Sequence, residues 1–431
     1  MKFLALLLAA TAMPAAAALS PAERAMIATV DAEQPRSLAL LKRLVNQNSG
    51  TMNLAGVTKV GAMMRAELEA LGFTVTWKPL PQTKRAGHLL ATRAGKADAR
   101  RLLLIGHLDT VFEADSPFQT FKREGDRGVG PGAGDDKGGM VVMLAALRAM
   151  RAAGTLDSAT IEIVLTGDEE RTGDPVGVAR ADLIAAGKRA DAALDFEGLS
   201  REDGRDMGSI ARRSSNSWQL VTTGKTGHSS AIFGVTYGDG AINEMARILA
   251  AFRRELPEPN LTFNTGLVAG GATAAMDADA VRATATGKSN IIPATAIARG
   301  DFRTLSDEQT ARVRAKMQAI VAAHAPGTSA EISFDEGYPP MAPTAGNRGL
   351  LAALNGVNRD LSLPEMAPLD PLKRGAGDIA FVARDVDGLV GLGPHSTGDH
   401  APGEAVDLPS IPLQAKRAAI LMTRLGQGRR P

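Results

Sequence analysis

The sequence predicts an α/β fold whose main sheet is mixed but largely parallel, with helices on both of its faces. The first observation is that apolar runs at residues 102–105, 161–166 and 192–194 have the length and composition of buried strands. The second is that helical patterns separate these runs, including residues 139–153, which Gly154 closes. Strands and helices that alternate in this way form βαβ units, and such units build parallel sheets.

The pattern changes at about Ser214, which predicts a second, smaller domain. Ser306 and Gln309 form a capping-box start for a helix whose apolar residues make one stripe. Together with a helix near residues 241–254, the expected strands give roughly the order β-α-β-β-α-β of a split βαβ, or ferredoxin-like, unit. These strands are expected at residues 218–222, 261–267, 290–292, 296–304 and 330–334.

The chain then returns to the first domain. Three prolines at positions 339, 340 and 343 mark a linker, and the residues beyond it complete the first unit. We therefore expect a discontinuous first domain at residues 19–213 and 336–431, into which residues 214–335 are inserted as the smaller domain.

The N-terminal 18 residues have the composition of a secretory signal peptide. Lys2 supplies one positive charge, an apolar run follows, and four alanines precede the polar Ser20. A membrane anchor fits less well, because the apolar run is shorter than the roughly 20 residues that a spanning helix needs. We expect a mature chain that begins near Leu19, is not inserted in the membrane, and is periplasmic or secreted.

Composition limits the function classes. The 431 residues carry a net charge of +2, and no run of five or more Lys or Arg residues occurs, so we expect no nucleic-acid partner. The chain contains no cysteine, so a metal ion must be held by His, Asp and Glu. That ligand set suits zinc or a similar divalent ion.

Each predicted strand of the first domain ends in acidic or imidazole residues. Because the carboxyl ends of parallel strands meet at one edge of a sheet, these side chains can converge. His107 and Asp109 lie two apart on an extended segment, so Asp109 can hold one ring nitrogen while the other binds a metal ion. Taken singly, the motifs have plainer interpretations: Asp135 and Asp136 can be helix caps, and Glu169 and Glu170 a solvated turn.

Taken together and in this order, the motifs resemble the M20 family of di-zinc metallopeptidases, in particular its glutamate carboxypeptidase branch. The resemblance spans nearly the whole mature chain. The matching pieces are His107-Leu108-Asp109, Gly134-Asp135-Asp136-Lys137-Gly138-Gly139, Asp168-Glu169-Glu170, Phe196-Glu197 and His400-Ala401-Pro402-Gly403-Glu404.

The resemblance implies two Zn²⁺ per subunit and a role for each matched residue. Asp135 would bridge the two ions, His107 and Glu197 would bind one of them, and Glu170 and His400 would bind the other. Asp109 would orient His107, and Glu169 would be the general base. The Asp135-Asp136 peptide bond would be cis. Two cations held in this way polarise a carbonyl and activate a water molecule.

The late histidine has two candidates. The family usually places this histidine four residues before a glutamate, which is the spacing of His400 and Glu404. His395 is the alternative, because the glutamate carboxypeptidase variant has a His-Ser pair at this point and Ser396 follows His395.

The inserted domain resembles the family's lid, through which subunits form a homodimer. His228 matches the lid histidine that reaches a neighbouring subunit's metal centre, and it would stabilise the oxyanion of the intermediate. Asn290 and Arg303 also match lid positions, where they would bind substrate, although Arg303 can instead pair with Asp301. In the first domain, Gly375 and Gly377 match a substrate-side turn, which reads Gly375-Ala376-Gly377-Asp378.

One departure affects the substrate. Related glutamate carboxypeptidases carry an arginine after the last lid strand, which holds the substrate's terminal carboxylate, whereas residues 334–340 contain none here. Arg303, Lys373 or Arg374 can take its place, or the substrate can differ. His88 and His324 match no motif.

The expected function is release of a C-terminal amino acid, with glutamate or aspartate as first candidates, from a short peptide or N-acyl amino acid. Within the family, Glu rather than Asp at position 197 favours a carboxypeptidase or deacylase over an aminopeptidase. Alternatives on the same scaffold are a deacylase, a dipeptidase and an acidic-oligopeptide depolymerase. A non-catalytic protein that binds zinc or a ligand is the alternative of another class.

Overall fold

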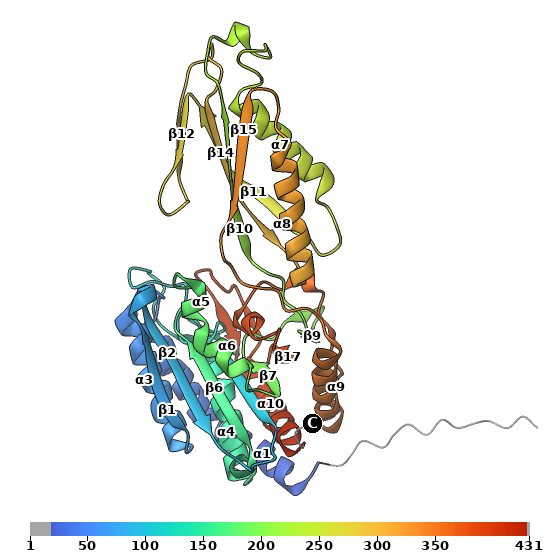
Figure 1. Ribbon diagram of the computed structural model, residues 1–431. Coiled ribbons are helices and arrows are strands. Elements are labelled where there is room, and N and C mark those ends of the chain that lie inside the picture. The colour runs from blue at the N-terminus through green and yellow to red at the C-terminus, as the bar shows by residue number, and fades with distance from the viewer. Residues whose placement is uncertain (1–18, 429–431) are drawn as a thin grey trace, which may run out of the picture.

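The computed structural model describes residues 19–428, so the predicted signal peptide at residues 1–18 lies outside the described residues. Figure 1 shows a large lobe, which contains the main sheet, and a small lobe that projects from it. The structure confirms the predicted α/β fold class. The predicted split βαβ unit is inserted into the chain of the large lobe.

The main sheet of the large lobe has the strand order β1-β2-β6-β3-β7-β17. The four strands β6, β3, β7 and β17 run parallel, while β1 and β2 pair antiparallel at one edge. The strands are β1 (Thr74–Leu80), β2 (Arg85–Arg93), β3 (Arg101–His107), β6 (Thr160–Thr166), β7 (Ala192–Asp195) and β17 (Gly388–Val390).

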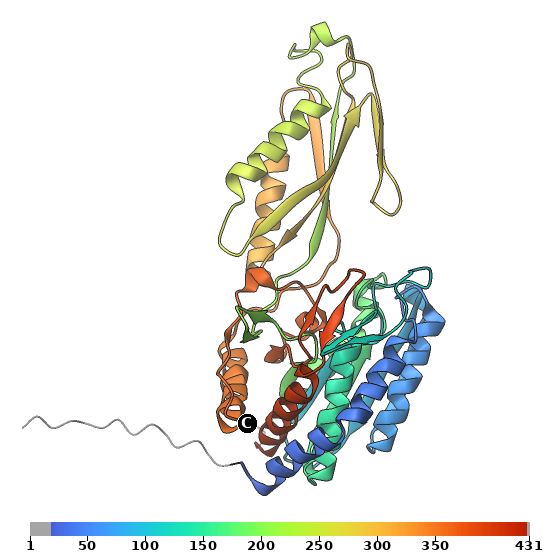
Figure 2. The same ribbon diagram turned by 180° about the vertical axis from the view of Figure 1, so that it is seen from behind.

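Helices cover both faces because both faces of the central strands are apolar. Along β3, Leu102 and Leu104 point into one buried cluster, and Leu103 and Ile105 point into another. Figure 1 shows α6 on one face, and Figure 2 shows α1, α4 and α10 on the other. The helices of the large lobe are α1 (Pro21–Ala32), α2 (Gln34–Val45), α3 (Leu54–Ala70), α4 (Lys137–Ala152), α5 (Val176–Ala179), α6 (Ala181–Gly187), α9 (Ala345–Asp360) and α10 (Ser410–Gln427).

Short strands border the main sheet on the side of the small lobe. They form one sheet of order β18-β19-β5-β4 and another of order β16-β9-β8. Their bounds are β4 (Lys122–Glu124), β5 (Arg127–Val129), β8 (Arg201–Glu202), β9 (Arg205–Gly208), β16 (Ala367–Pro368), β18 (Ser396–Thr397) and β19 (Ala405–Asp407).

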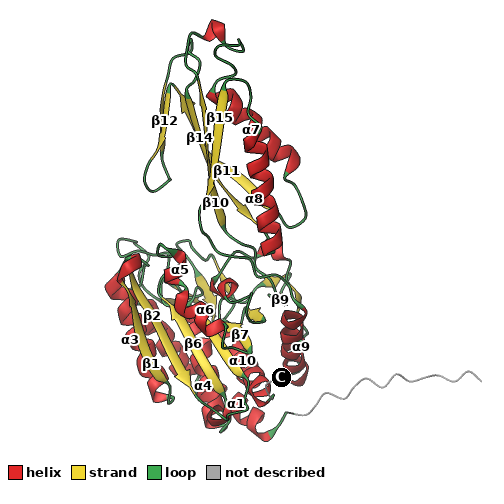
Figure 3. Cartoon of the chain, viewed as in Figure 1, coloured by secondary structure: helices red, strands yellow, loops and turns green. Residues whose placement is uncertain are grey.

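The small lobe is an antiparallel sheet of order β11-β14-β10-β15 with helices on one face, as Figure 3 shows. Trp218 of β10 is completely buried against Phe252 of α7, so this lobe has a core of its own. Its elements are β10 (Asn216–Gly224), α7 (Ala241–Glu255), β11 (Thr262–Gly271), β12 (Thr273–Met276), β13 (Ala283–Thr286), β14 (Thr295–Arg303), α8 (Asp307–Ala322) and β15 (Thr328–Phe334).

One predicted strand is wrong. Residues 290–292 make only an isolated bridge between Ile291 and His228, and the hairpin β12–β13 lies before them instead. Ile292 donates its backbone amide to Gly227, and Pro293 follows without an N–H group, so no ladder can continue here.

Each helix within residues 19–428 is too short or too polar to cross a bilayer.

Candidate functional site

The carboxyl ends of three parallel strands bring the predicted site residues together. His107 ends β3, Glu169 and Glu170 follow β6, and Glu197 follows β7. The loop before α4 adds Asp135, and the connection between β18 and β19 adds His400. These residues therefore reach one edge of the sheet from five separate segments of the chain.

The Asp135 carboxylate lies at the centre of this arrangement. Its Oδ1 is 2.9 Å from Nε2 of His107, and its Oδ2 is 3.0 Å from Nε2 of His400. Burial alone would raise the pKa of Asp135, but the hydrogen bonds from the two histidines lower it below its ordinary value. An ionised carboxylate with one imidazole on each oxygen has the form of a bridging ligand. The Asp135-Asp136 peptide bond is cis.

Glu170 completes a group that can hold a metal ion. Its Oε2 is 3.1 Å from Nε2 of His400, while its Oε1 is buried without a hydrogen-bond partner. His107, Asp135 and Glu170 offer ligand atoms that all lie within 4.8 Å of one another. A buried carboxylate oxygen without a partner is costly unless a cation or water reaches it, so these residues fit a divalent metal ion.

Asp109 is buried beneath the metal-binding group and fixes two of its parts. Nδ1 of His107 lies 3.4 Å from Asp109 Oδ1 and 3.1 Å from its backbone oxygen. The same carboxylate accepts hydrogen bonds from the backbone amides of Glu169 and Glu170, and from Thr51 Oγ1 at 2.6 Å. Asp109 thus orients the imidazole and also the loop after β6.

Glu169 lines a cavity of about 280 Å³ together with Asp135, Glu197 and His400. Burial raises the pKa of Glu169 well above its ordinary value; the charge of His107 opposes this rise and that of Glu197 adds to it. Cations bound beside it would lower the pKa again. The Glu169 side chain thus lies in a cavity that it shares with residues of the metal-binding group.

Glu197 lies on the same cavity wall, but arginines hold one of its oxygens. Its Oε2 is 2.8 Å from Nη1 of Arg212 and 3.4 Å from Nη2 of Arg374. The sequence alone predicts no role for Arg212, and it predicts a role for Arg374 only at a substrate carboxylate. No local pattern identifies Arg212, which stands in the connection between β9 and β10.

Arg212 also shapes the turn of Gly375 and Gly377. Its Nε donates to the Gly375 carbonyl at 2.7 Å, and its Nη2 donates to the Ala376 carbonyl. A Cβ at position 377 would lie 2.1 Å from Nη1 of Arg212, so a larger residue here would displace the guanidinium group. The turn borders the cavity at Gly375, with its carbonyls directed at Arg212.

Glu404 is a second residue without a role in the sequence analysis. Its carboxylate accepts hydrogen bonds from the backbone amides of Gly132, Gly134 and Asp135, at 3.1, 2.8 and 3.2 Å. Glu404 belongs to the same motif as His400 and lies four residues after it. This spacing is the sequence signal that points to Glu404. Glu404 holds the glycine-rich loop that presents Asp135.

Three predicted residues of the small lobe do not line this cavity. His228 is exposed and pairs with Ser230, at 2.8 Å from Nδ1 to Oγ. Asn290 lies in the segment paired with it, since its carbonyl accepts from the Ser229 amide. Arg303 is 3.5 Å from Asp301, as in the ion pair considered for it.

The remaining histidines lie away from Asp135. Nδ1 of His395 is 3.1 Å from the carbonyl of Leu199, and the residue lines a neighbouring cavity of about 480 Å³. His88 is completely buried against the Ala179 carbonyl, and His324 lies 3.8 Å from Glu244.

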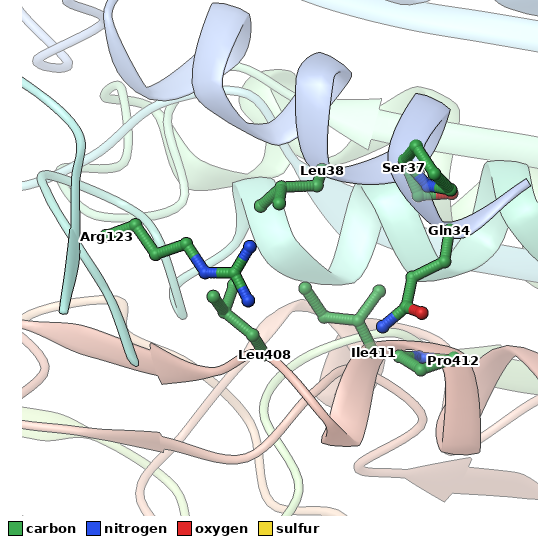
Figure 4. A pocket seen from close by; sticks show the side chains of 8 residues that line it. Gln34, Ser37, Leu38, Arg123, Leu408, Ile411 and Pro412 are labelled. Carbon is green, nitrogen blue, oxygen red and sulfur yellow. The ribbon is translucent and has the colours of Figure 1, made fainter. Parts of the chain in front are cut away.

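A separate apolar pocket of about 240 Å³ lies between α2 and the start of α10 (Figure 4). It contains none of the predicted site residues. Its lining residues are Gln34, Pro35, Ser37, Leu38, Arg123, Leu408, Ile411 and Pro412.

Comparison with known proteins agrees with this geometry. Residues 103–424 match the family described as Peptidase family M20/M25/M40. The chain is 30% identical over 419 residues to Carboxypeptidase G2 of Pseudomonas sp. (strain RS-16), which covers 92% of this chain and 91% of that protein. It is 27% identical over 393 residues to a succinyl-diaminopimelate desuccinylase of Variovorax paradoxus (strain S110), covering 87% and 94%.

The fold is similar to that of a dinuclear metal-binding peptidase of the M20 family from Bacillus subtilis. The crystal structure of that protein matches with a TM-score of 0.64 and 16% identity, over 92% of this chain and 99% of that one. These findings confirm the family resemblance and the enzyme class, and they set aside a non-catalytic ligand-binding protein. The chain belongs to Peptidase family M20/M25/M40 and is a metal-dependent hydrolase of amide bonds.

Proposed function

We propose that the chain is a periplasmic or secreted zinc-dependent enzyme of the carboxypeptidase type, which releases a C-terminal amino acid from short peptides or N-acyl amino acids. The observation that carries this proposal is the Asp135 carboxylate between His107 and His400, with Glu170 on one side and the free Glu169 carboxylate on the cavity wall. The similarity to Carboxypeptidase G2 over nearly the whole chain supports the carboxypeptidase type.

In this proposal, Asp135 would be a ligand shared by two Zn²⁺ per subunit. His107 and Glu197 would hold one ion, and Glu170 and His400 would hold the other. Both arginine contacts of Glu197 use Oε2, so Oε1 is the oxygen that it offers. Bound in this way, the ions would supply Lewis acidity to the scissile carbonyl and to the attacking water.

The chain's own residues then move the proton. Glu169 takes it from the attacking water and delivers it to the leaving amine, which requires a carboxylate that no other side chain occupies. Asp109 keeps the His107 imidazole and the Glu169 backbone in position throughout.

A substrate with a free carboxylate suits the charges of the cavity. Arg212, Lys373 and Arg374 all line it, and Nε of Arg374 is buried without a hydrogen-bond partner. Arg374 is therefore our first choice to replace the arginine missing from residues 334–340. Arg303 is the second choice, since its Nη1 lies 3.9 Å from the Cβ position of residue 375.

The small lobe is proposed to act as lid and dimerisation domain. His228 does not line the cavity within one subunit, and the same part of the small lobe exposes the side chains of Phe233 and Val235. Contact with a second subunit would bury these side chains and bring His228 and Asn290 to a neighbouring site. Sedimentation of the protein, with Phe233→Ser as the variant expected to dissociate, tests this arrangement.

A substrate panel tests the reaction. Mature protein (residues 19–431) loaded with zinc is incubated with dipeptides and N-acyl amino acids, including N-succinyl compounds, and the released amino acid is identified by mass spectrometry. We expect release of one type of C-terminal residue by the wild type and none by Glu169→Gln with its metal retained. Preference for the acyl group over the amino acid would instead favour a deacylase, as in the desuccinylase relatives.

A further inference from the structure

We propose that Tyr338 and Arg180 are positioning residues for Glu169. They donate hydrogen bonds to backbone carbonyls of the loop after β6, whereas the Glu169 side chain lines the cavity. The inference rests on the proposed function, because it takes Glu169 as the general base. Neither Tyr338 nor Arg180 lines the cavity that contains Asp135.

The Tyr338 hydroxyl makes three hydrogen bonds at this loop. It donates to the Glu169 backbone carbonyl at 2.8 Å. It accepts from Nη2 of Arg180 at 2.8 Å, and it lies 2.8 Å from Oγ1 of Thr172. One hydroxyl group has one proton and two acceptor sites, so these partners satisfy it fully.

The backbone of Glu169 is consequently held from both sides. Its amide donates to Oδ1 of Asp109 at 3.0 Å, and its carbonyl accepts from Tyr338. Because both backbone groups are fixed, the direction in which the side chain leaves the loop is fixed as well. Neither bond uses the carboxylate, which stays free for proton transfer.

Arg180 supports this arrangement from a completely buried position. Its Nη1 is 2.5 Å from Asp168 Oδ1, its Nε is 2.7 Å from Asp378 Oδ1, and its Nη2 donates to the Asp168 carbonyl at 3.2 Å. The guanidinium also lies 5.7 Å from the centre of the Tyr338 ring. A buried guanidinium with two carboxylates holds a rigid geometry, because removing any partner leaves an unpaired buried charge.

Tyr338 connects this loop to the small lobe. It stands in the segment that returns from β15, and its carbonyl accepts from the Ser215 amide of the outgoing segment at 3.0 Å. The resemblance places the substrate-binding arginine in this same return segment. In this chain the return segment instead carries Tyr338, whose hydroxyl donates to the backbone carbonyl of Glu169.

The test replaces the hydroxyl alone. In Tyr338→Phe the ring stays against Phe381, from which it is 4.9 Å between ring centres, but the bond to Glu169 is lost. We expect kcat to fall about 10- to 100-fold, which is typical when a supporting partner of an active-site group is removed. KM and zinc content should stay within about twofold of the wild type. Thr155→Val, which removes a hydroxyl before the start of β6 and therefore at the opposite end of the sheet, is the control and should leave kcat unchanged.

A double variant separates positioning from general loss of structure. If Tyr338 acts through Glu169, adding Tyr338→Phe to Glu169→Gln should lower the residual single-turnover rate no further. An equal fall in both backgrounds, an unchanged kcat in Tyr338→Phe, or zinc loss in proportion to activity would each overturn the proposal. Arg180→Lys keeps the charge but loses the planar fork, and it should lower kcat in the same way.

A readout without turnover separates this inference from the proposed function. Hydrogen exchange of the peptide covering residues 167–173 should accelerate in Tyr338→Phe and not in Thr155→Val. If the wild type hydrolyses nothing in the panel, the proposed function fails, but faster exchange in Tyr338→Phe still supports the positioning of Glu169 by Tyr338. Unchanged exchange in Tyr338→Phe refutes this positioning role even if the enzyme is active.

Discussion

Glu404 holds Asp135 through the backbone: Oε1 of Glu404 accepts a hydrogen bond from the Asp135 amide at 3.2 Å. The same carboxylate accepts from the amides of Gly132 and Gly134, so three successive bonds fix the loop before α4. The position of the central carboxylate therefore depends on a residue 269 positions later in the chain.

Glu404→Gln should weaken zinc binding while the fold stays intact. The amide keeps one acceptor oxygen but loses the second and the negative charge, so the loop is held less firmly. We expect zinc affinity to fall about 10- to 100-fold, measured by competition with a chromogenic chelator. Glu331→Gln on β15, whose side chain is exposed, is the control. Equal affinities of Glu404→Gln and the wild type would contradict the role of this carboxylate.

His400→Ala and His395→Ala should separate the two candidates for the late ligand. Only His400 contacts Asp135 and Glu170, whereas His395 contacts the Leu199 carbonyl. We expect His400→Ala to lose more than about 100-fold in kcat, exceeding the typical loss for a supporting partner. It should also lose bound zinc, measured by atomic emission. His395→Ala should keep its zinc, and the reverse pattern would assign the ligand to His395.

Gly139→Ala should destabilise the protein because the start of α4 lies against the site. A Cβ at this position would lie 2.0 Å from Oδ1 of Asp136 and 2.0 Å from the Phe196 carbonyl. We expect a loss of about 1–3 kcal/mol in the free energy of unfolding, measured by chemical denaturation. In α9, Gly349→Ala meets no atom within 4 Å and should gain up to about 1 kcal/mol instead. Similar values for the two variants would show that α4 can shift.

Glu23→Gln should reduce stability at neutral pH and make less difference in acid. Glu23 closes the capping box of α1 with Ser20 and pairs with Arg424 of α10 at 2.7 Å. Burial opposes the change, but the hydrogen bonds from Arg424 and Ser20 lower the pKa of Glu23 below its ordinary value.

A lowered folded-state pKa means that this stabilisation is complete above the unfolded-state pKa of Glu and is lost as the pH falls through the folded-state value. We expect about 1 kcal/mol lower stability of Glu23→Gln at pH 7, and a shrinking difference below about pH 4, by thermal unfolding across pH. Glu69→Gln, whose pair with Arg65 is exposed, is the control. A difference that stays constant down to pH 2 would contradict a charge effect.

The arrangement of strands was predictable because its signals are local. The runs at residues 102–105, 161–166 and 192–194 became β3, β6 and β7, since a continuous apolar segment must be buried on both faces of a sheet. The split βαβ order followed from helix caps and apolar stripes in the same way. The strand expected at residues 290–292 failed, because an apolar pair before Pro293 can be buried without forming a ladder.

The sequence by itself determined that His107, Glu169, Glu170 and Glu197 stand at strand ends, because strand ends are set by nearby residues. The ordered motifs added Asp135 and His400 as candidates. Only the tertiary structure decided what surrounds them. Arg212 reaches Glu197, Tyr338 reaches Glu169 and Glu404 reaches Asp135 across loops far apart in the chain. Such contacts carry no periodic pattern in the sequence, because they depend on how the loops pack once the strands have fixed their ends.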